Sequence, residues 1–379
     1  MLVPWKKKKP REAAAAAPTT GAEREAVFGM GYLPLKTGET KLYEALRESI
    51  PLIDAAISKI IRLVGSFRVE TGRGETDREL ERFLKTVPVG PLHQGVAFFL
   101  WGYLDTLLTY GNAVGEILPT RDMRGIGALF LPPIENVQLK RGENPMETVI
   151  CVGRGGSFQP VPYPELVVCS ALNPPDSCSK GVSLLKGLPF VSQILLTIFQ
   201  CMGNNFERAG NLRYAVTYRP GGEGGRSRER AQMIAREWAQ AMSPGKVRDF
   251  VAVGDVEIKA IGADGPILDT QVPVRLILEQ IVAKLGIPPF MLGLSWSSTE
   301  RMSKQQSDIL TSELEAYRTL LEPVIRRICG LWLRQRGESG EHEICWDTIN
   351  LQDEVDEAQA MLYREQAAYY RARAAAVKQ

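Results

Sequence analysis

The most informative stretch of this chain is residues 269–293, DTQVPVRLILEQIVAKLGIPPFMLG. Its apolar residues recur every three or four positions, which predicts a helix over about 273–285 with one apolar side. The residues on that side are Val274, Ile277, Leu278, Ile281 and Leu285. The adjacent prolines Pro288 and Pro289 follow, and proline lacks the amide hydrogen that a helix interior needs. The stretch therefore predicts a helix that stops at the turn GIPPFMLG.

A second, longer helix is predicted downstream, after the polar stretch LSWSSTERMSKQQ. Its apolar residues alternate steps of four and three along one face, over about six turns. They are Leu310, Leu314, Tyr317, Leu321, Val324, Ile328 and Leu331. Pro323 lies inside the pattern and predicts a kink. Beyond this helix, EICWDTI at 343–349 resembles a strand, and acidic DEVDEAQ leads into an Ala-rich helix with a basic end.

Upstream of residues 269–293 lies a small unit between two helices. The first helix spans about 189–208, and strand-like LRYAVTY at 212–218 follows it. A Gly-rich loop, a helix around 228–241 and two strand candidates, DFVAVG and EIKAIG, complete a β-loop-α-β-β unit. Apolar residues cover more than one face of the helix 189–208: Val191, Ile194, Leu195, Ile198, Phe199 and Met202. The second apolar face could be buried in a deep core of the same chain, or it could be covered by a neighbouring subunit of a closed ring.

The N-terminal half combines helices with short strands. Helical spacing from near Leu42 predicts a helix through Leu46, Ile50, Ile53, Ile57, Ile60 and Ile61. A polar stretch at 70–81 and a helix at about 92–110 follow. From Gly111, short runs rich in Val and Ile alternate with turns, which predicts one small sheet. That sheet ends in the loop NPPDSCSKG at 173–181, and the chain as a whole is expected to be α+β.

Composition narrows the class of protein. The 379 residues include 46 Lys and Arg against 44 Asp and Glu, a net charge of +2, with 44% hydrophobic residues. This balance excludes a wholly disordered, collagen-like or polytopic membrane protein, and it gives no global attraction to nucleic acid. Residues 1–25 carry a local charge of +3 without an apolar run, so we expect no signal peptide there. The six cysteines include no Cys-x-x-Cys pair, and we expect most of them to be reduced and buried.

Sequence motifs for catalysis are missing. The chain contains no P-loop and no G-x-G-x-x-G after a strand, and the Gly-Leu-Ser-Trp-Ser run at 293–297 fails the last position of a nucleophile elbow. His342 and Cys345 form a lone His-x-x-Cys pair, whereas a zinc site needs two further ligands. We therefore expect no catalytic residues, no metal and no cofactor.

The order of these elements resembles one family, the portal proteins of tailed bacteriophages. Three stretches carry the resemblance: TYGNAVGEI at 109–117, the helix 184–208 with the unit after it, and residues 269–293 with the polar loop and long helix that follow. The resemblance covers most of residues 42–350. The order of the elements, with IPPFMLG at the hinge, is more specific than any single motif.

The resemblance implies a portal fold that assembles as a ring of about twelve subunits. Such a ring sits at one capsid vertex, and double-stranded DNA passes through it during packaging and ejection. Carried onto this sequence, the family's parts are a flexible basic N-terminal arm at 1–41, a mixed α/β wing at 42–183 and 303–350, stem helices at 184–208 and 270–286, an α/β clip at 209–269, a tunnel loop at 287–302 and a short helical crown at 351–379. The wing part at 303–350 includes the long kinked helix.

A DNA-facing tunnel loop is the first site that the resemblance implies. Its residues are Ser295, Trp296, Ser297, Ser298, Thr299, Glu300, Arg301 and Lys304. Each contact with a DNA phosphate raises affinity without reading the base sequence. A channel through which DNA slides must bind it weakly, so a hydroxyl-rich surface of mixed charge suits this task. The alternative is an ordinary solvated helix start with Ser303 as N-cap.

A basic cluster in the clip is the second implied site, for docking partners. Its residues are Arg219, Arg226, Arg228, Arg230, Lys246 and Arg248. Arginine favours interfaces because it contacts carboxylates through two hydrogen bonds at once. The alternative is a solvated basic loop and helix face. Trp238 in the same unit is either a core residue or an anchor between subunits.

The implied partners are further copies of this chain, non-specific double-stranded DNA, terminase, the head–tail adaptor, and the major capsid and scaffold proteins, with no membrane contact. The subunit would be made in the bacterial host cytoplasm and reside in the virion at the portal vertex. Two other classes remain open: an enzyme of undefined chemistry, and a membrane- or polyanion-binding protein. The latter would use the N-terminal KKKK run and the C-terminal basic residues Arg364, Arg371, Arg373 and Lys378.

Overall fold

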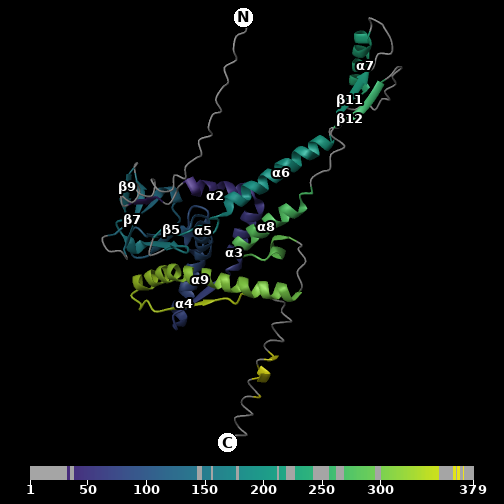
Figure 1. The fold of residues 1–379 in the computed structure, drawn as a ribbon. Coiled ribbons are helices and arrows are strands. Elements are labelled where there is room, and N and C mark those ends of the chain that lie inside the picture. Colours follow the sequence, from purple (N-terminus) through teal and green to yellow (C-terminus); the bar gives the residue numbers. More distant parts are fainter. Residues whose placement is uncertain are drawn as a thin grey trace. The chain divides into compact units, whose positions relative to one another are not determined.

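The fold is described from a computed structural model of the chain (Figure 1). The description covers residues 32–34, 38–142, 147–154, 157–175, 179–210, 213–218, 227–241, 256–261, 269–294, 300–349, 362–363, 365–367 and 370. The chain forms two compact units. The first comprises Met1–Pro189 with Ile281–Gln379, and the second comprises Phe190–Gln280.

The first unit begins with a short strand, β1 (Tyr32–Pro34), and two helices, α2 (Gly38–Ser49) and α3 (Pro51–Leu63). The prediction of one continuous helix here was wrong. Pro51 occupies the first turn of α3, where its missing amide hydrogen costs nothing, and the same residue cannot continue α2. The apolar spacing nevertheless marks the buried side of α3 correctly, since Ile53, Ile57 and Ile60 are almost fully buried.

Helix α4 (Gly74–Thr86) replaces most of the polar stretch expected at 70–81. Only Thr76 and Leu80 of this helix are buried, so its apolar stripe is too narrow to produce a clear periodic pattern. The hairpin of β3 (Pro88–Val89) and β4 (His93–Gln94) comes next. Because the hairpin occupies residues up to Gln94, the helix predicted at 92–110 begins later and is observed as α5 (Val96–Tyr110). Eight residues of α5 are buried, which makes it the central helix of the first unit.

Two sheets occupy the place of the single small sheet expected after Gly111. The larger has the order β10-β5-β6-β3-β4, and the other has the order β1-β7-β8-β9. The additional strands are β5 (Asn112–Pro119), β6 (Ile126–Phe130), β7 (Val137–Arg141), β8 (Thr148–Arg154), β9 (Ser157–Pro160) and β10 (Val167–Ala171). The strands β6 and β7 are consecutive but belong to different sheets, because Pro132, Pro133 and a short 3-10 turn separate them.

The C-terminal part of the first unit is dominated by α9 (Glu300–Gln335). The long helix predicted from the alternating pattern is confirmed, and Pro323 lies inside it. Six of the seven stripe residues are buried, Leu331 being the exception. After α9, β13 (Glu343–Trp346) pairs antiparallel with β2 (Phe67–Glu70), which joins the two ends of this unit's sequence.

The second unit contains the elements predicted between the two bracketing helices. Helix α6 (Leu188–Gly210) is followed by β11 (Arg213–Tyr218), α7 (Ser227–Ala241), β12 (Val256–Ile261) and α8 (Gln271–Leu285). The strands β11 and β12 pair antiparallel, with Tyr218 opposite Val256. The expected strand DFVAVG lies outside the described residues, as does most of the expected C-terminal helix.

Candidate interaction surfaces

Three of the eight predicted tunnel-loop residues lie at the start of α9. Ser295, Trp296, Ser297, Ser298 and Thr299 lie outside the described residues. Glu300 and Arg301 occupy the first turn of α9, and the structure does not describe their side chains. Lys304 is exposed in the second turn, so it belongs to a helix. Because α9 begins at Glu300, Ser303 lies inside the helix and is not its N-cap, whereas the choice between a solvated helix start and a DNA-facing loop stays untested.

The turn before α9 is well defined. The predicted stop at GIPPFMLG is observed as Gly286 in a left-handed conformation, followed by the 3-10 turn Pro289–Leu292 and a second left-handed glycine, Gly293. Both glycines have positive φ angles, 70° and 76°, which side chains with a Cβ adopt only at a cost. This fixed turn sets where the chain leaves α8 and approaches the predicted DNA-facing segment.

The predicted clip cluster lies mostly outside the described residues. Arg219, Arg226, Lys246 and Arg248 are not described, and Arg228 and Arg230 belong to α7 without described side chains. The structure therefore does not test whether these six residues gather. Trp238 of α7 is half-buried, which decides neither for a core residue nor for an anchor between subunits.

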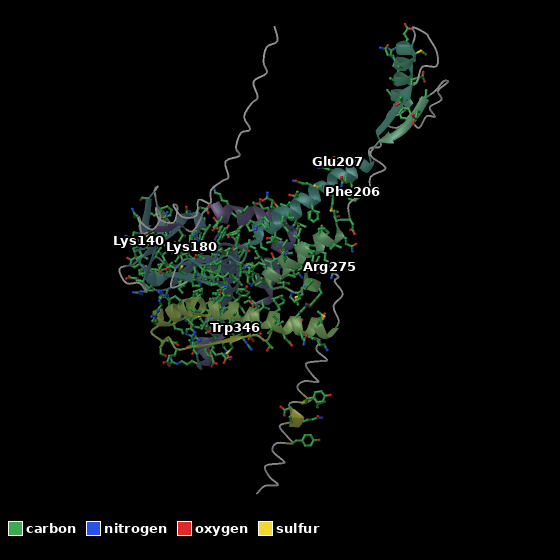
Figure 2. All side chains as sticks on the ribbon, in the orientation of Figure 1. Lys140, Lys180, Phe206, Glu207, Arg275 and Trp346 are labelled. Carbon is green, nitrogen blue, oxygen red and sulfur yellow. The ribbon has the colours of Figure 1, made fainter. Side chains whose placement is uncertain are left out.

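Helix α6 exposes large apolar side chains along its length. Phe190 is 73% exposed and Phe206 65%, and Ile194 and Phe199 are also exposed. Figure 2 labels Phe206 near the end of this helix. Leu195 on the same helix is buried. Exposed aromatic rings of this size favour a covering partner, because each Å² of apolar surface removed from water contributes about 25 cal/mol. Sequence reasoning found the two-sided apolar character of this helix, and the structure shows which residues lack cover.

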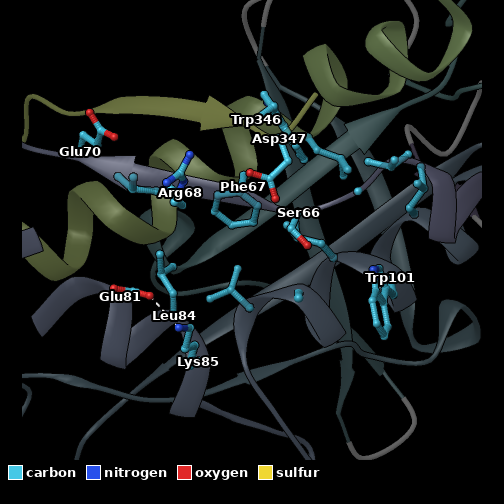
Figure 3. A pocket seen from close by; sticks show the side chains of 18 of the residues that line it. Ser66, Phe67, Arg68, Glu70, Glu81, Leu84, Lys85, Trp101, Trp346 and Asp347 are labelled. Carbon is cyan, nitrogen blue, oxygen red and sulfur yellow. Dashed lines mark hydrogen bonds and ion pairs between the residues drawn. The ribbon is translucent and has the colours of Figure 1, made fainter. Parts of the chain in front are cut away.

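A pocket of about 550 Å³ lies within the first unit, between α4, α5, β2 and β13 (Figure 3). Leu84, Trp101 and Phe67 supply apolar walls, and Trp346 closes one side. The buried indole nitrogen of Trp346 has no hydrogen-bond partner among the described residues. At the rim, Lys85 Nζ lies 2.6 Å from Glu81 Oε1, and this bond lowers the pKa of Glu81. Sequence reasoning missed this pocket, because its walls come from segments far apart in the chain.

Three charged side chains of the first unit, Arg47, Asp54 and Asp105, form a network. Arg47 donates to Asp54 at 2.7 Å, and to Asp105 and Thr109 at 3.0 and 2.7 Å. Burial alone would lower the pKa of Arg47, but the bonds to Asp105 and Asp54 raise it. The group is thus a structural ion-pair network between α2, α3 and α5.

Within the described residues, no three His, Cys, Asp or Glu side chains form a group that could hold a metal ion. No helix among the same residues is long and apolar enough to span a membrane.

Comparison with known proteins finds the fold of this chain in solved structures. No protein-family model matches the chain, and no curated protein matches it. A chain of the virion of a native gene transfer agent (GTA) particle matches 92% of this chain and 95% of its own length, with a TM-score of 0.65 and 14% identity. A chain in the neck of the native GTA particle, computed with C12 symmetry, matches 83% of this chain and 84% of its own, with a TM-score of 0.56 and 14% identity.

A more distant likeness is to an HK97 family phage portal protein from Corynebacterium diphtheriae, with a TM-score of 0.40 and 12% identity over 79% of this chain and 93% of that one. The GTA likenesses cover nearly the whole chain. They confirm the predicted α+β architecture, which this chain shares with chains of the GTA virion and neck.

Proposed function

We propose that this chain is the subunit of a portal ring, a head–tail connector at one vertex of a phage-type capsid. The observation that carries the proposal is the fold shared with a chain of the GTA virion and neck over more than nine-tenths of both chains. The neck structure computed with C12 symmetry supports a ring of about twelve copies. A subunit of such a ring would reside in the virion after synthesis in the host cytoplasm.

The parts of the ring subunit are proposed from the element order. Residues 42–183 and 303–350 would form the wing, α6 and α8 the two stem helices, and 209–269 the clip. The tunnel loop would span 287–302, with the arm at 1–41 and the crown at 351–379. The antiparallel pair of β11 and β12 supports the clip as a unit of its own, since it closes the chain excursion between the two helices.

Ring assembly gives the exposed face of α6 a function. Head-to-tail contacts bring one subunit's surface against a different surface of the next, and rotation closes the ring. Phe190, Ile194, Phe199 and Phe206 would be covered by the neighbouring subunit. The matching apolar residues on α8 are Val272 and Leu276, 59% and 56% exposed. These two helices therefore supply the chemistry that an interface between copies requires.

The channel contacts and partners are proposed on the family resemblance. Ser295–Thr299, with Glu300, Arg301 and Lys304, would face double-stranded DNA, and the Arg-rich clip would bind terminase and then the head–tail adaptor. Weak contacts of mixed charge would let DNA slide. The role is structural: the chain would conduct DNA, and the energy for packaging would come from the partner motor.

The test is the assembly state of the purified full-length protein, by negative-stain electron microscopy and native mass spectrometry. Rings with a central hole and about twelve copies are expected. The double variant Phe190→Asp with Phe206→Asp should remain folded but fail to form rings. Met123→Asp, at an exposed apolar residue in the turn between β5 and β6, is the matched control and should form rings normally. Rings that form equally well in the double variant would contradict the α6 interface, and protein that stays monomeric with capsid and scaffold partners present would contradict the portal assignment.

A further inference from the structure

A second pocket, of about 770 Å³, lies where the turn after α9 folds back on the last third of that helix. Its size is within the range of small-ligand sites, about 300–1,000 Å³. Its lining residues are Pro323, Arg326, Arg327, Gly330, Arg334, Gly340, Glu341 and His342. The proposed portal function gives this pocket no role.

The spacing along α9 explains why three arginines meet here. Pro323, Arg327, Gly330 and Arg334 follow at steps of four, three and four, which places them on one face of the helix. Arg326 lies beside them. Gly330 lies directly against the turn, since a Cβ there would be in van der Waals contact with His342 Cε1, 3.8 Å away. A larger side chain at this position would occupy the space that the pocket needs.

Backbone contacts hold the three guanidinium groups around the pocket. Arg326 donates to the carbonyl oxygen of His342 at 3.3 Å, and Arg334 Nε donates to that of Gly330 at 3.1 Å. Arg327 donates to the carbonyl oxygen of Pro164 at 3.5 Å. A guanidinium has five N–H donors, so each of these contacts leaves most donors for a ligand.

The charge of the lining residues selects the ligand. Three arginines against Glu341 give a sum of +2 with His342 neutral. Glu322, outside the lining, lies 3.8 Å from Arg326 and reduces that charge in part. The imidazole Nδ1 lies 2.8 Å from the carbonyl oxygen of Gly340, and the buried Nε2 has no partner among the described residues. The imidazole of His342 therefore lines one side of the pocket, and the arginines supply the hydrogen-bond donors for a ligand.

We propose that this pocket binds a phosphate group. Arginine pairs with phosphate through two parallel N–H bonds, and several converging guanidiniums favour a doubly charged oxyanion over a single carboxylate. The phosphate can come from a free phosphate compound or from the backbone of duplex DNA. Both sources present phosphate oxygens to the arginines, the free compound with up to two negative charges and the DNA backbone with one per phosphate, and the test separates them.

Isothermal titration calorimetry of the full-length protein with inorganic phosphate, at constant ionic strength, tests the binding. Wild-type protein should bind phosphate, and Arg334→Gln should weaken binding about tenfold or more, because it removes a charge-assisted bond. The double variant Arg326→Gln with Arg334→Gln should abolish binding. Arg121→Gln is the matched control: the same change at an exposed arginine in the turn after β5, outside the pocket, should leave binding unchanged.

A short DNA duplex in competition identifies the source. Loss of the phosphate heat on adding duplex, with duplex binding weakened in the double variant, assigns the site to DNA backbone. Phosphate binding that the duplex does not reduce assigns it to free phosphate compounds. The proposal is overturned if wild-type protein binds no phosphate, or if Arg334→Gln and Arg121→Gln bind it equally. None of these readings requires the protein to form a ring, so they remain separate from the test of the portal function.

Discussion

Arg318 of α9 donates its Nε hydrogen to the carbonyl oxygen of Val64, 2.8 Å away and 254 positions earlier in the chain. The same guanidinium donates to the carbonyl oxygen of Asp347 at 2.8 Å and lies 4.9 Å above the ring of Trp346. One buried side chain thus connects the long helix to the end of α3 and to the end of β13. Burial lowers the pKa of Arg318, and the nearby charges of Glu315 and Asp347 offset this loss of hydration only in part.

Replacing this arginine is expected to weaken the first unit. Arg318→Met keeps a long side chain but leaves the buried carbonyl of Val64 and the carbonyl of Asp347 without their donor, which should lower the unfolding free energy by about 3 kcal/mol. Urea denaturation followed by circular dichroism measures the loss. Arg121→Met, at an exposed position, should change stability by less than about 0.5 kcal/mol. Equal unfolding midpoints for the two variants would show that Arg318 is not the connection described here.

A second prediction concerns Gly181, which packs against the start of β5. A Cβ at this position would collide with the carbonyl of Gly111 and lie 2.6 Å from the backbone nitrogen of Leu172. Because backbone atoms cannot move aside cheaply, Gly181→Ala should destabilise the first unit by about 3 kcal/mol or more. Gly74→Ala, where a Cβ meets nothing within 4 Å, is the control and should be nearly neutral. A thermal melt compares the two, and a native-like melt for Gly181→Ala would contradict this packing.

Stability at alkaline pH should depend on Tyr317. Burial first, and the charge of Glu313 second, raise the pKa of Tyr317 to about 12 in the folded protein. The unfolded chain, with a tyrosine pKa of about 10, loses the phenolic proton first, so the folded state loses stability as the pH rises from about 10 to about 12. Tyr317→Phe should remove a part of this decline on the order of 1–2 kcal/mol. Denaturation curves at several pH values measure it, and parallel declines in wild-type and variant protein would argue against a buried phenol.

Cysteine labelling should distinguish Cys329 from Cys201. Burial raises the pKa of the Cys329 thiol to about 12, so this residue should not react with a thiol reagent until the protein unfolds. Cys201 is exposed on α6 and should react in isolated subunits. In assembled rings it should be protected, because the neighbouring subunit would cover α6. Mass spectrometry of labelled peptides reads both residues, and equal Cys201 labelling in subunits and rings would remove α6 from the proposed interface.

The DNA-facing assignment leads to a prediction about packaging. Trp296→Ala with Arg301→Ala should leave ring assembly intact, because neither residue belongs to the proposed α6 interface. The same double variant should impair DNA packaging or retention in an in vivo complementation assay. Normally filled, stable heads would count against the tunnel loop at 287–302.

The helices could be predicted from the sequence where their apolar residues recur at helical spacing. Helix α9 was predictable because its stripe continues for more than twenty residues, whereas its first turn, Glu300–Met302, contains polar helix formers that give no periodic signal. Helix α4 was missed for the same reason, since Leu80 is its only fully buried apolar residue. The spacing of apolar residues along the sequence identifies a helix only when that helix buries a broad apolar face.

Strand pairing was less predictable than strand position. The apolar runs at 113–118 and 166–170 indicated β5 and β10, but nothing in either run specifies that Val167 pairs with Glu116. Partner choice depends on contacts between distant segments, and so do both pockets: Arg326, Arg327 and Arg334 approach His342 only because the chain reverses after α9. The tunnel-loop and clip residues were proposed from family resemblance, and the described part of the chain leaves them as proposals.

The pairing of Tyr218 with Val256 has a consequence for how this chain can change over time. The chain leaves β11 at Tyr218 and re-enters β12 at Val256, and these two residues are paired neighbours. A small domain whose own ends lie close together could therefore be grafted between them without altering the register of either strand. The sequence 219–255 can thus change in length over evolution while the pairing of β11 with β12 is kept.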